Sequence, residues 1–187
     1  MTSFARVLSL LLLMLVTRPA FAQAPAPRQP RGTASDVSNA DLMATVQKMT
    51  AAVGDVQLRV VAIDNQPNVG VGIVKRTKPG GANSIEHSQI TEVYHMIEGS
   101  ATLVTGGTME NPREAAPDSQ VVKVLNGPST NGGKVTGGVT RKIGVGDVVI
   151  IPPNTPHWFS EINSDQIVYL VIRVDPHKVL PAGLGAK

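Results

Sequence analysis

The sequence predicts an all-β protein, a sandwich or barrel of antiparallel strands, preceded by one amphipathic helix. Three observations support this class. From Val56 onward, short alternating or β-branched runs follow one another at close spacing, with clusters of Gly, Pro, Asn and Asp between them. Helical periodicity is confined to one stretch near residue 45. Strands do not alternate with long helical segments, as they would in a βαβ protein.

The first 22 residues have the pattern of a secretory signal peptide. Arg6 supplies the positive start, residues 7–16 are apolar except for Ser9, and residues 20–22 (Ala-Phe-Ala) match a cleavage site of small residues. This run of ten residues is too short to span a bilayer, which takes about 20. We expect cleavage after Ala22, export to the periplasm or the medium, and no membrane association of the mature chain.

A spacer and a helix are expected next. Residues 23–37 are rich in Pro and Ala and lack apolar periodicity, which is typical of an extended spacer, so the folded domain is expected to cover 38–187. Ser38 and Asp41 form a capping pattern and predict a helix over 39–53. Its apolar stripe, which we interpret as packing surface, consists of Leu42, Val46, Met49 and Val53.

The remaining chain is dominated by strand signals. A hairpin is predicted from residues 56–60 and 69–73 around the turn at 64–68. Its face with Gly70 and Gly72 either lets another group approach closely or simply packs against bulky side chains. Residues 79–81 (Pro-Gly-Gly) predict another turn. Further strands are predicted at 90–97, 101–105, 120–125, 147–151, 157–162 and 166–174.

The glycine-rich stretch 126–142 is expected to be a flexible flap over one mouth of the barrel. A phosphate-binding loop is excluded here, because that motif needs Lys directly after its second glycine and Gly133 stands in that place.

Composition excludes several classes of function. Without Arg6 and Arg18 of the leader, the 17 basic residues become 15 against 14 acidic ones, a formal net charge of +1. That balance, with only six Phe, Tyr and Trp residues, does not suit nucleic-acid binding. The chain has no cysteine, so it has no disulfide, thiolate ligand or cysteine nucleophile, and no serine lies in a Gly-x-Ser-x-Gly elbow.

Two motifs carry the candidate chemistry. The first has the spacing His87-x4-Glu92-x6-Gly99. The second begins at Gly146 and runs through Pro152, Pro153 and Asn154 to His157. Proline fixes φ and cannot donate to a sheet ladder, so the chain must leave the sheet at Pro152 and re-enter near His157, which is therefore held at a rigid corner.

Together these motifs resemble those of the cupin superfamily, H-x-H-x(3,4)-E-x6-G and G-x5-P-x-G-x2-H-x3-N. The resemblance implies a cupin-type jelly-roll β-barrel. This chain departs from the pattern in several places. Ile85 replaces the first histidine, Asn154 replaces a glycine, Glu161 replaces the final asparagine, and 46 residues separate Gly99 from Gly146, which is long for the family.

His87, Glu92 and His157 form the candidate metal site. Two imidazoles and one carboxylate suit Fe or Mn and leave positions open for substrate, and Zn or Ni would also accept them. His87 and Glu92 are five residues apart and would face opposite sides of one regular strand, so they converge only if the chain bends around residues 88–90. The alternative is a metal-free pocket in which both histidines are polar lining residues.

Strand alternation also assigns the neighbouring side chains. It places Tyr94 and Met96 on the same face as Glu92, and His95 on the other face. It turns Phe159 and Glu161 inward with His157, so Tyr94, Met96 and Phe159 are expected to form an apolar pocket wall. Glu161 is then a candidate catalytic base, or a group that orients the substrate. His177 lies in a terminal segment and is expected to be exposed.

Two functional hypotheses follow. In one, a divalent metal polarises a small oxygen-bearing substrate or activates oxygen, as the resemblance to cupin dioxygenases, isomerases and lyases implies. In the other, the barrel binds or senses a small molecule without turnover, because one fold hosts many functions. Unpaired strand edges in such small barrels also predict a homodimer.

Overall fold

The computed structural model describes residues 33–78 and 83–183. The predicted signal peptide, the spacer up to residue 32 and the predicted turn at 79–81 lie outside these residues. Contacts divide the chain into a unit that ends at Ala34 and a second unit that begins at Ser35. All the elements described below belong to the second unit.

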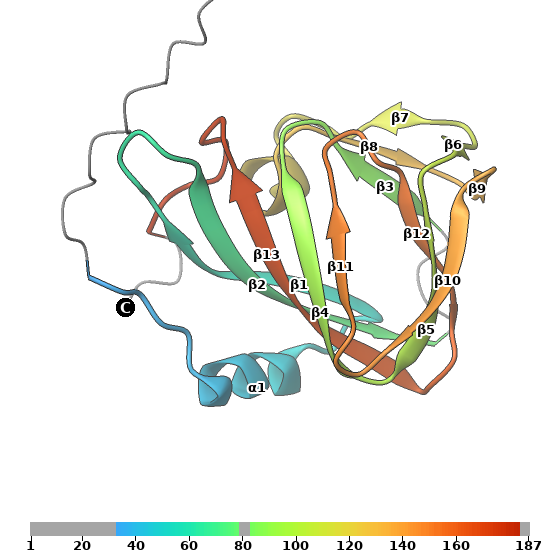
Figure 1. The fold of residues 1–187 in the computed structure, drawn as a ribbon, viewed down its shortest axis with the longest axis horizontal. Coiled ribbons are helices and arrows are strands. Elements are labelled where there is room, and N and C mark those ends of the chain that lie inside the picture. Colours follow the sequence, from blue (N-terminus) through green and yellow to red (C-terminus); the bar gives the residue numbers. More distant parts are fainter. Residues whose placement is uncertain (1–32, 79–82, 184–187) are drawn as a thin grey trace, which may run out of the picture. The chain divides into compact units, whose positions relative to one another are not determined.

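Two antiparallel sheets form the domain and are visible in Figure 1. The five-stranded sheet has the order β1 (Val53–Val61), β2 (Asn68–Thr77), β13 (Gln166–Asp175), β4 (Thr91–Glu98), β11 (Val148–Ile151). The six-stranded sheet has the order β10 (Val139–Gly144), β5 (Ser100–Thr105), β12 (His157–Ile162), β3 (Ser84–His87), β8 (Ser129–Gly132), β7 (Arg113–Glu114). A small ribbon pairs β6 (Thr108–Met109) with β9 (Val135–Thr136). This is the jelly-roll architecture that the sequence predicts.

The main core lies between the two sheets. Alternate residues of each strand point inward, because side chains in a strand have a period of two. Tyr94 and Met96 come from β4, Leu103 from β5, and Phe159 from β12. The rest of this buried cluster is Val74, Ala101, Ile143, Val149, Ile151, Ile162, Ile167, Tyr169 and Val171.

The helix α1 (Asn39–Lys48) is shorter than predicted. The Ser38 hydroxyl caps it by accepting a hydrogen bond from the Asp41 N–H, as the capping pattern indicates. Val53 instead begins β1, because its backbone pairs with Arg76 of β2. Val46 and Met49 pack on Ile73 and Val168, on the outer side of the five-stranded sheet, and Leu42 packs against them. The stripe is therefore packing surface except at Val53, which is exposed. Among the described residues, no helix is long and apolar enough to cross a membrane.

The predicted strand at 120–125 is wrong. These residues form a short helical turn of the π type, η1 (Val121–Asn126). Its β-branched residues favour a strand locally, but Leu125 and Asn126 are buried against the barrel and the Lys123 N–H bonds to the Ser119 carbonyl. Tertiary contacts therefore override propensity here.

The glycine-rich stretch 126–142 is not a flap. It supplies strands β8 and β9 and the first residues of β10, and β10 pairs with β5 in the six-stranded sheet. β8 pairs in turn with β3. Gly132 lies against Met109, where a Cβ would approach the Met109 side chain to 2.8 Å. The glycines here allow close packing between strands rather than mobility.

Candidate metal centre

The first motif changes sheets between its two polar residues. His87 is the last residue of β3 in the six-stranded sheet, and Glu92 is the second residue of β4 in the five-stranded sheet. Residues 88–90 form the bend between them, as the odd spacing requires. The two side chains can therefore approach each other across the interior of the barrel.

The second motif forms the predicted corner. β11 ends at Ile151 and β12 begins at His157, with the proline segment between them. Asn154 has a φ of 57°, a left-handed conformation that asparagine tolerates better than most residues, which explains its use where the family pattern has glycine. The Asn154 N–H donates to the His87 carbonyl at 2.8 Å. This bond ties the corner directly to the end of β3.

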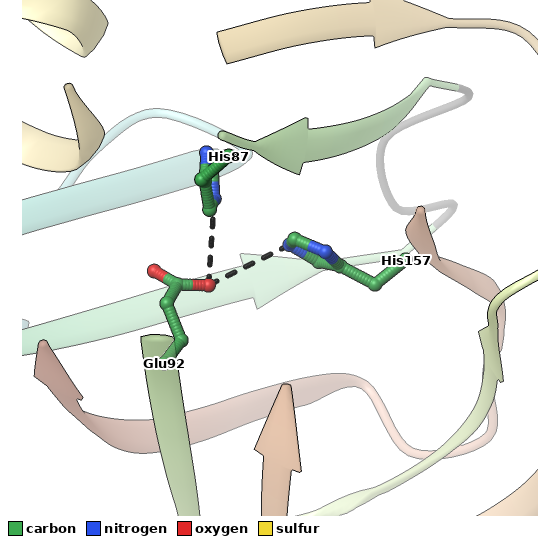
Figure 2. Close-up of side chains that lie close together, drawn as sticks. All are labelled: His87, Glu92 and His157. Atoms are coloured by element: carbon green, nitrogen blue, oxygen red, sulfur yellow. Dashed lines mark ion pairs between the residues drawn. The ribbon is translucent and has the colours of Figure 1, made fainter. Parts of the chain in front are cut away.

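His87, Glu92 and His157 meet in the interior, as Figure 2 shows. The Nε2 atom of each histidine lies 3.5 Å from Glu92 Oε2. All three side chains are buried, and their ligand atoms all lie within 4.8 Å of one another. The structure therefore brings together the three residues that the sequence motifs select.

Hydrogen bonds decide which ring nitrogen carries the proton. The Ser129 hydroxyl donates to the Gly127 carbonyl at 2.8 Å, so it can only accept from His87 Nδ1, which is 2.9 Å away. The Thr155 carbonyl also only accepts, and it lies 3.0 Å from His157 Nδ1. Both Nδ1 atoms are therefore protonated in the neutral rings. In this tautomer His157 Nε2 presents its lone pair toward Glu92, whereas His87 Nε2 accepts from Asn126 Nδ2 at 3.1 Å.

Glu92 is held by two further groups. The Tyr94 hydroxyl donates to Oε2 at 2.7 Å, and Arg173 Nε donates to Oε1 at 3.1 Å. Arg173 is 1% exposed and also donates to Asp55 Oδ2 and Gln57 Oε1, each at 2.6 Å. One buried guanidinium thus connects β13 to β1 and β4, and fixes the orientation of the carboxylate.

Sequence reasoning missed Arg173, although β2 contains a signal for it. A Cβ on Gly72 would lie 2.9 Å from Arg173 Nη1, and one on Gly70 would lie 2.6 Å from Gln57 Nε2. The two glycines leave room for this network. The predicted close approach to that face of the hairpin is confirmed, and the approaching group is an arginine.

Electrostatics favour an ionised Glu92 and a neutral His157, the states that a bound cation requires. Burial by itself would raise the pKa of Glu92, but His87, Arg173 and His157 together lower it well below its usual value. Burial, reinforced by the nearby His87, lowers the pKa of His157 to about 4. Burial, reinforced by the Glu92 charge, raises the pKa of Tyr94 well above its usual value. At neutral pH the cluster therefore has an ionised carboxylate, a neutral His157 and an intact tyrosine hydroxyl.

Two of the three donor separations suit a divalent metal. Two ligand atoms that are each ~2.0–2.2 Å from one ion lie roughly 3.0–3.6 Å apart, and the 3.5 Å separations fall in this range. Asn126 adds a second observation. Its Nδ2 lies 3.1 Å from His87 Nε2, while its Oδ1 is buried and has no hydrogen-bond partner among the described residues. Turning this amide over would place a fourth donor atom, an oxygen, beside His87 Nε2.

A cavity of about 170 Å³ adjoins the cluster. Tyr94 lines it, as predicted, together with Ile85, which occupies the position of the family's first histidine. Met96 and Phe159 do not line it, so their predicted place in the pocket wall is wrong. They lie deeper in the core, where the Phe159 ring stacks on Tyr94 with centroids 6.4 Å apart.

The structure also corrects the orientation predicted for Glu161. A β-bulge between Phe159 and Glu161 interrupts the alternation, so Ile162 is buried and Glu161 is exposed. Glu161 borders a separate open pocket with Lys78, Ser160 and Ile162, and the geometry gives no support to a catalytic role beside His157. His95 and His177 are exposed, as predicted.

The family model described as Cupin matches residues 41–185. The chain belongs to the cupin family. No curated protein sequence matches it. As a cupin, it keeps the motif histidine and glutamate of the first motif and the histidine of the second. Among the histidines and the glutamate of the two motifs, it lacks one, the first histidine, where Ile85 stands.

Several solved structures are similar to this cupin at low identity. They include the DMSP lyase DddQ from Ruegeria pomeroyi (15% identity, TM-score 0.41, 68% of this chain and 49% of that chain). A recombinant oxalate oxidase in complex with glycolate has 13% identity, a TM-score of 0.42, and coverage of 70% and 54%. A cupin-like protein from Thermotoga maritima has 18% identity, a TM-score of 0.40, and coverage of 69% and 72%. The chain thus spans about half the length of the lyase and of the oxidase.

Proposed function

We propose that this cupin binds a divalent metal through His87, Glu92 and His157 and acts on a small oxygen-bearing molecule in the adjoining cavity. One observation carries the proposal: two imidazole nitrogens and an ionised carboxylate oxygen converge in a buried space. Three electron-rich atoms repel one another, and burial strengthens the repulsion, so the arrangement calls for a cation among them.

The metal, when bound, would act as a Lewis acid toward an oxygen of the substrate or toward oxygen itself. The chain's own residues prepare the site for it. Arg173 and Tyr94 hold the two oxygens of Glu92, so the carboxylate does not have to reorganise. The Tyr94 hydroxyl keeps its proton on Oη, facing Glu92. Because the cluster is buried, bulk water has little access to it, and electrostatic interactions there are stronger than at the surface.

Elemental analysis tests this proposal. The mature protein, purified without a histidine tag, is examined by plasma mass spectrometry beside His157→Ala and an exposed control, His95→Ala. Near-stoichiometric iron, manganese, zinc or nickel that is lost only in His157→Ala supports the metal centre. Absence of metal from the unmodified protein, even after reconstitution with each ion, would contradict it. The metal-free binding module would then be the better explanation of the cavity.

We also infer that the chain is exported and that its first 22 residues are removed. The support is the charged, apolar and small-residue pattern of the leader. Expression of the full chain in a bacterial host, followed by N-terminal sequencing of the periplasmic fraction, should give a protein that begins at Gln23. Full-length protein in the cytoplasmic fraction would contradict export.

A homodimer is proposed as the solution state. β11 lies at the edge of the five-stranded sheet and exposes Val148 and Ile150, which are 61% and 66% exposed. An apolar strand edge is a ready template for pairing with a second copy. Light scattering at micromolar concentration should give twice the monomer mass, and Ile150→Lys should reduce it. A monomer in the unmodified protein would count against the dimer.

A further inference from the structure

Arg76 is a second functional group of the cavity that the metal motif does not include. It lies on β2, two residues after the core residue Val74, and alternation points both side chains into the barrel. Arg76 lines the same cavity as His87, Glu92 and His157. Arg76 is only partly buried, and a cationic side chain that lines a cavity can serve an anionic ligand.

The two arginines of the cavity differ in their partners. Arg173 forms ion pairs with Asp55 and Glu92, at 2.6 and 3.1 Å. Among the described residues, no ion pair involves Arg76. Arg76 Nε donates to the Tyr169 hydroxyl at 3.1 Å, and its two terminal nitrogens make no hydrogen bond within the described part of the chain. Its donors are therefore available to a molecule in the cavity.

The guanidinium of Arg76 is also held in place. It lies over the Phe159 ring, 5.4 Å from the centroid, while Tyr169 fixes Nε. Tyr169 packs on Tyr94, with ring centroids 4.5 Å apart, and Tyr94 bonds to Glu92. This chain of contacts joins Arg76 to the metal cluster. A planar guanidinium that is already oriented binds a carboxylate through two parallel hydrogen bonds at little further entropic cost.

The formal charge of the cavity with a bound metal also favours an anionic ligand such as a carboxylate. The cavity lining contains two arginines, Arg76 and Arg173, and two carboxylates, Asp55 and Glu92, so their formal charges cancel. A divalent metal at the proposed site would leave an excess of +2, which an anion would reduce. The volume of about 170 Å³ is below the ~300–1,000 Å³ of pockets for drug-sized ligands, so the anion must be small.

We propose that the cavity binds a small carboxylate, with Arg76 holding its carboxylate group beside the metal cluster. The metal part of this arrangement, and the excess positive charge that the metal would bring, rest on the proposed function. The Arg76 part rests on the unpaired guanidinium alone, so the two can fail independently.

Calorimetry with a panel of carboxylates and their neutral amides tests the proposal. The panel consists of acetate, lactate, malonate and succinate, with lactamide as the uncharged isostere of lactate. Each is titrated into metal-free protein and into protein loaded with Mn(II). The variants are Arg76→Met, Arg76→Lys, and Arg141→Met, an exposed arginine on β10 that serves as the control. Metal content and thermal unfolding are measured for every sample.

We expect at least one carboxylate to bind and lactamide to bind much more weakly than lactate. Arg76→Met should weaken carboxylate binding by about 10- to 100-fold, because a charge-assisted pair is lost. Arg76→Lys should fold, keep the charge and recover only part of the affinity. Arg141→Met should bind like the unmodified protein.

Equal binding of lactate and lactamide, unchanged affinity in Arg76→Lys and Arg76→Met, or no binding by any member of the panel would overturn the proposal. The metal measurements separate this result from failure of the proposed function. Stoichiometric metal without Arg76-dependent carboxylate binding refutes only the carboxylate site. Arg76-dependent binding to a protein that takes up no metal refutes only the metal centre.

Discussion

The two ends of β12 show how differently one short strand can be used. At its start, His157 is buried, its Nδ1 proton is committed to a carbonyl, and its Nε2 faces Glu92. Four residues later, Glu161 is exposed beside an open pocket. Both are polar residues, and simple alternation places both inward. The difference teaches that a bulge, rather than residue type, separates the candidate site from the surface.

The largest effect should come from Arg173, which holds Glu92, the buried carboxylate that His157 faces. Arg173→Met leaves the buried Glu92 and the partly exposed Asp55 without their cation, so the free energy of unfolding should fall by ~3–5 kcal/mol. Arg141→Met, at an exposed position, should change it by less than about 0.5 kcal/mol. Urea unfolding of metal-free protein measures both. Similar values for the two variants would mean that the buried network contributes little to stability.

A fall in pH should also lower the stability of the protein through His157, at the buried end of β12. The pKa of His157 is about 4 in the folded protein against an ordinary 6.5, so the unfolded chain takes up a proton first as the pH falls. Stability should fall by roughly 3 kcal/mol between pH 7 and pH 4. The depressed pKa of Glu92 continues the loss below pH 4.5, where its unfolded form protonates. Metal-free His157→Gln should show a flatter profile above pH 4.5, and an unchanged slope would contradict this assignment.

Metal affinity should distinguish the two ends of the strand directly. His157→Ala removes a proposed ligand and should weaken metal binding by about 100-fold or more, whereas Glu161→Ala should leave it unchanged. Competition with a fluorescent chelator gives both dissociation constants. An equal loss in Glu161→Ala would mean that the exposed end of β12 contributes to the site after all.

The smallest effect should come from Asn126, beside the cluster. If its amide oxygen turns toward the metal, Asn126→Leu should weaken binding by about 10-fold, and Asn126→Asp should strengthen it. The Mn(II) electron paramagnetic resonance spectrum should also change in both variants. Unaltered affinity and spectrum in Asn126→Leu would show that the amide serves only as a hydrogen-bond donor to His87.

Much of the fold and of the site could be predicted because the evidence is local. Pro152 has no N–H to donate to a neighbouring strand, so β11 ends before it whatever the tertiary surroundings of that strand. The odd spacing of His87 and Glu92 demands a bend. Val121 to Leu125 shows the limit of local evidence, since its β-branched residues suit a strand and only contact with the barrel makes it helical. Arg173 could not be recognised as part of the site because its partners on β1 and β4 lie far from it in the sequence.

The sequence by itself determined the class of fold, the sheet change in the first motif and the three converging residues, because turn chemistry and strand parity act over a few residues. Only the tertiary structure decided which side chains join them. The bulge in β12 turned Glu161 outward, the glycines of β2 admitted Arg173, and burial of η1 brought Asn126 to His87. Each of these depends on the fit between strands that meet only in the folded chain, and spacing along the sequence carries no record of that fit.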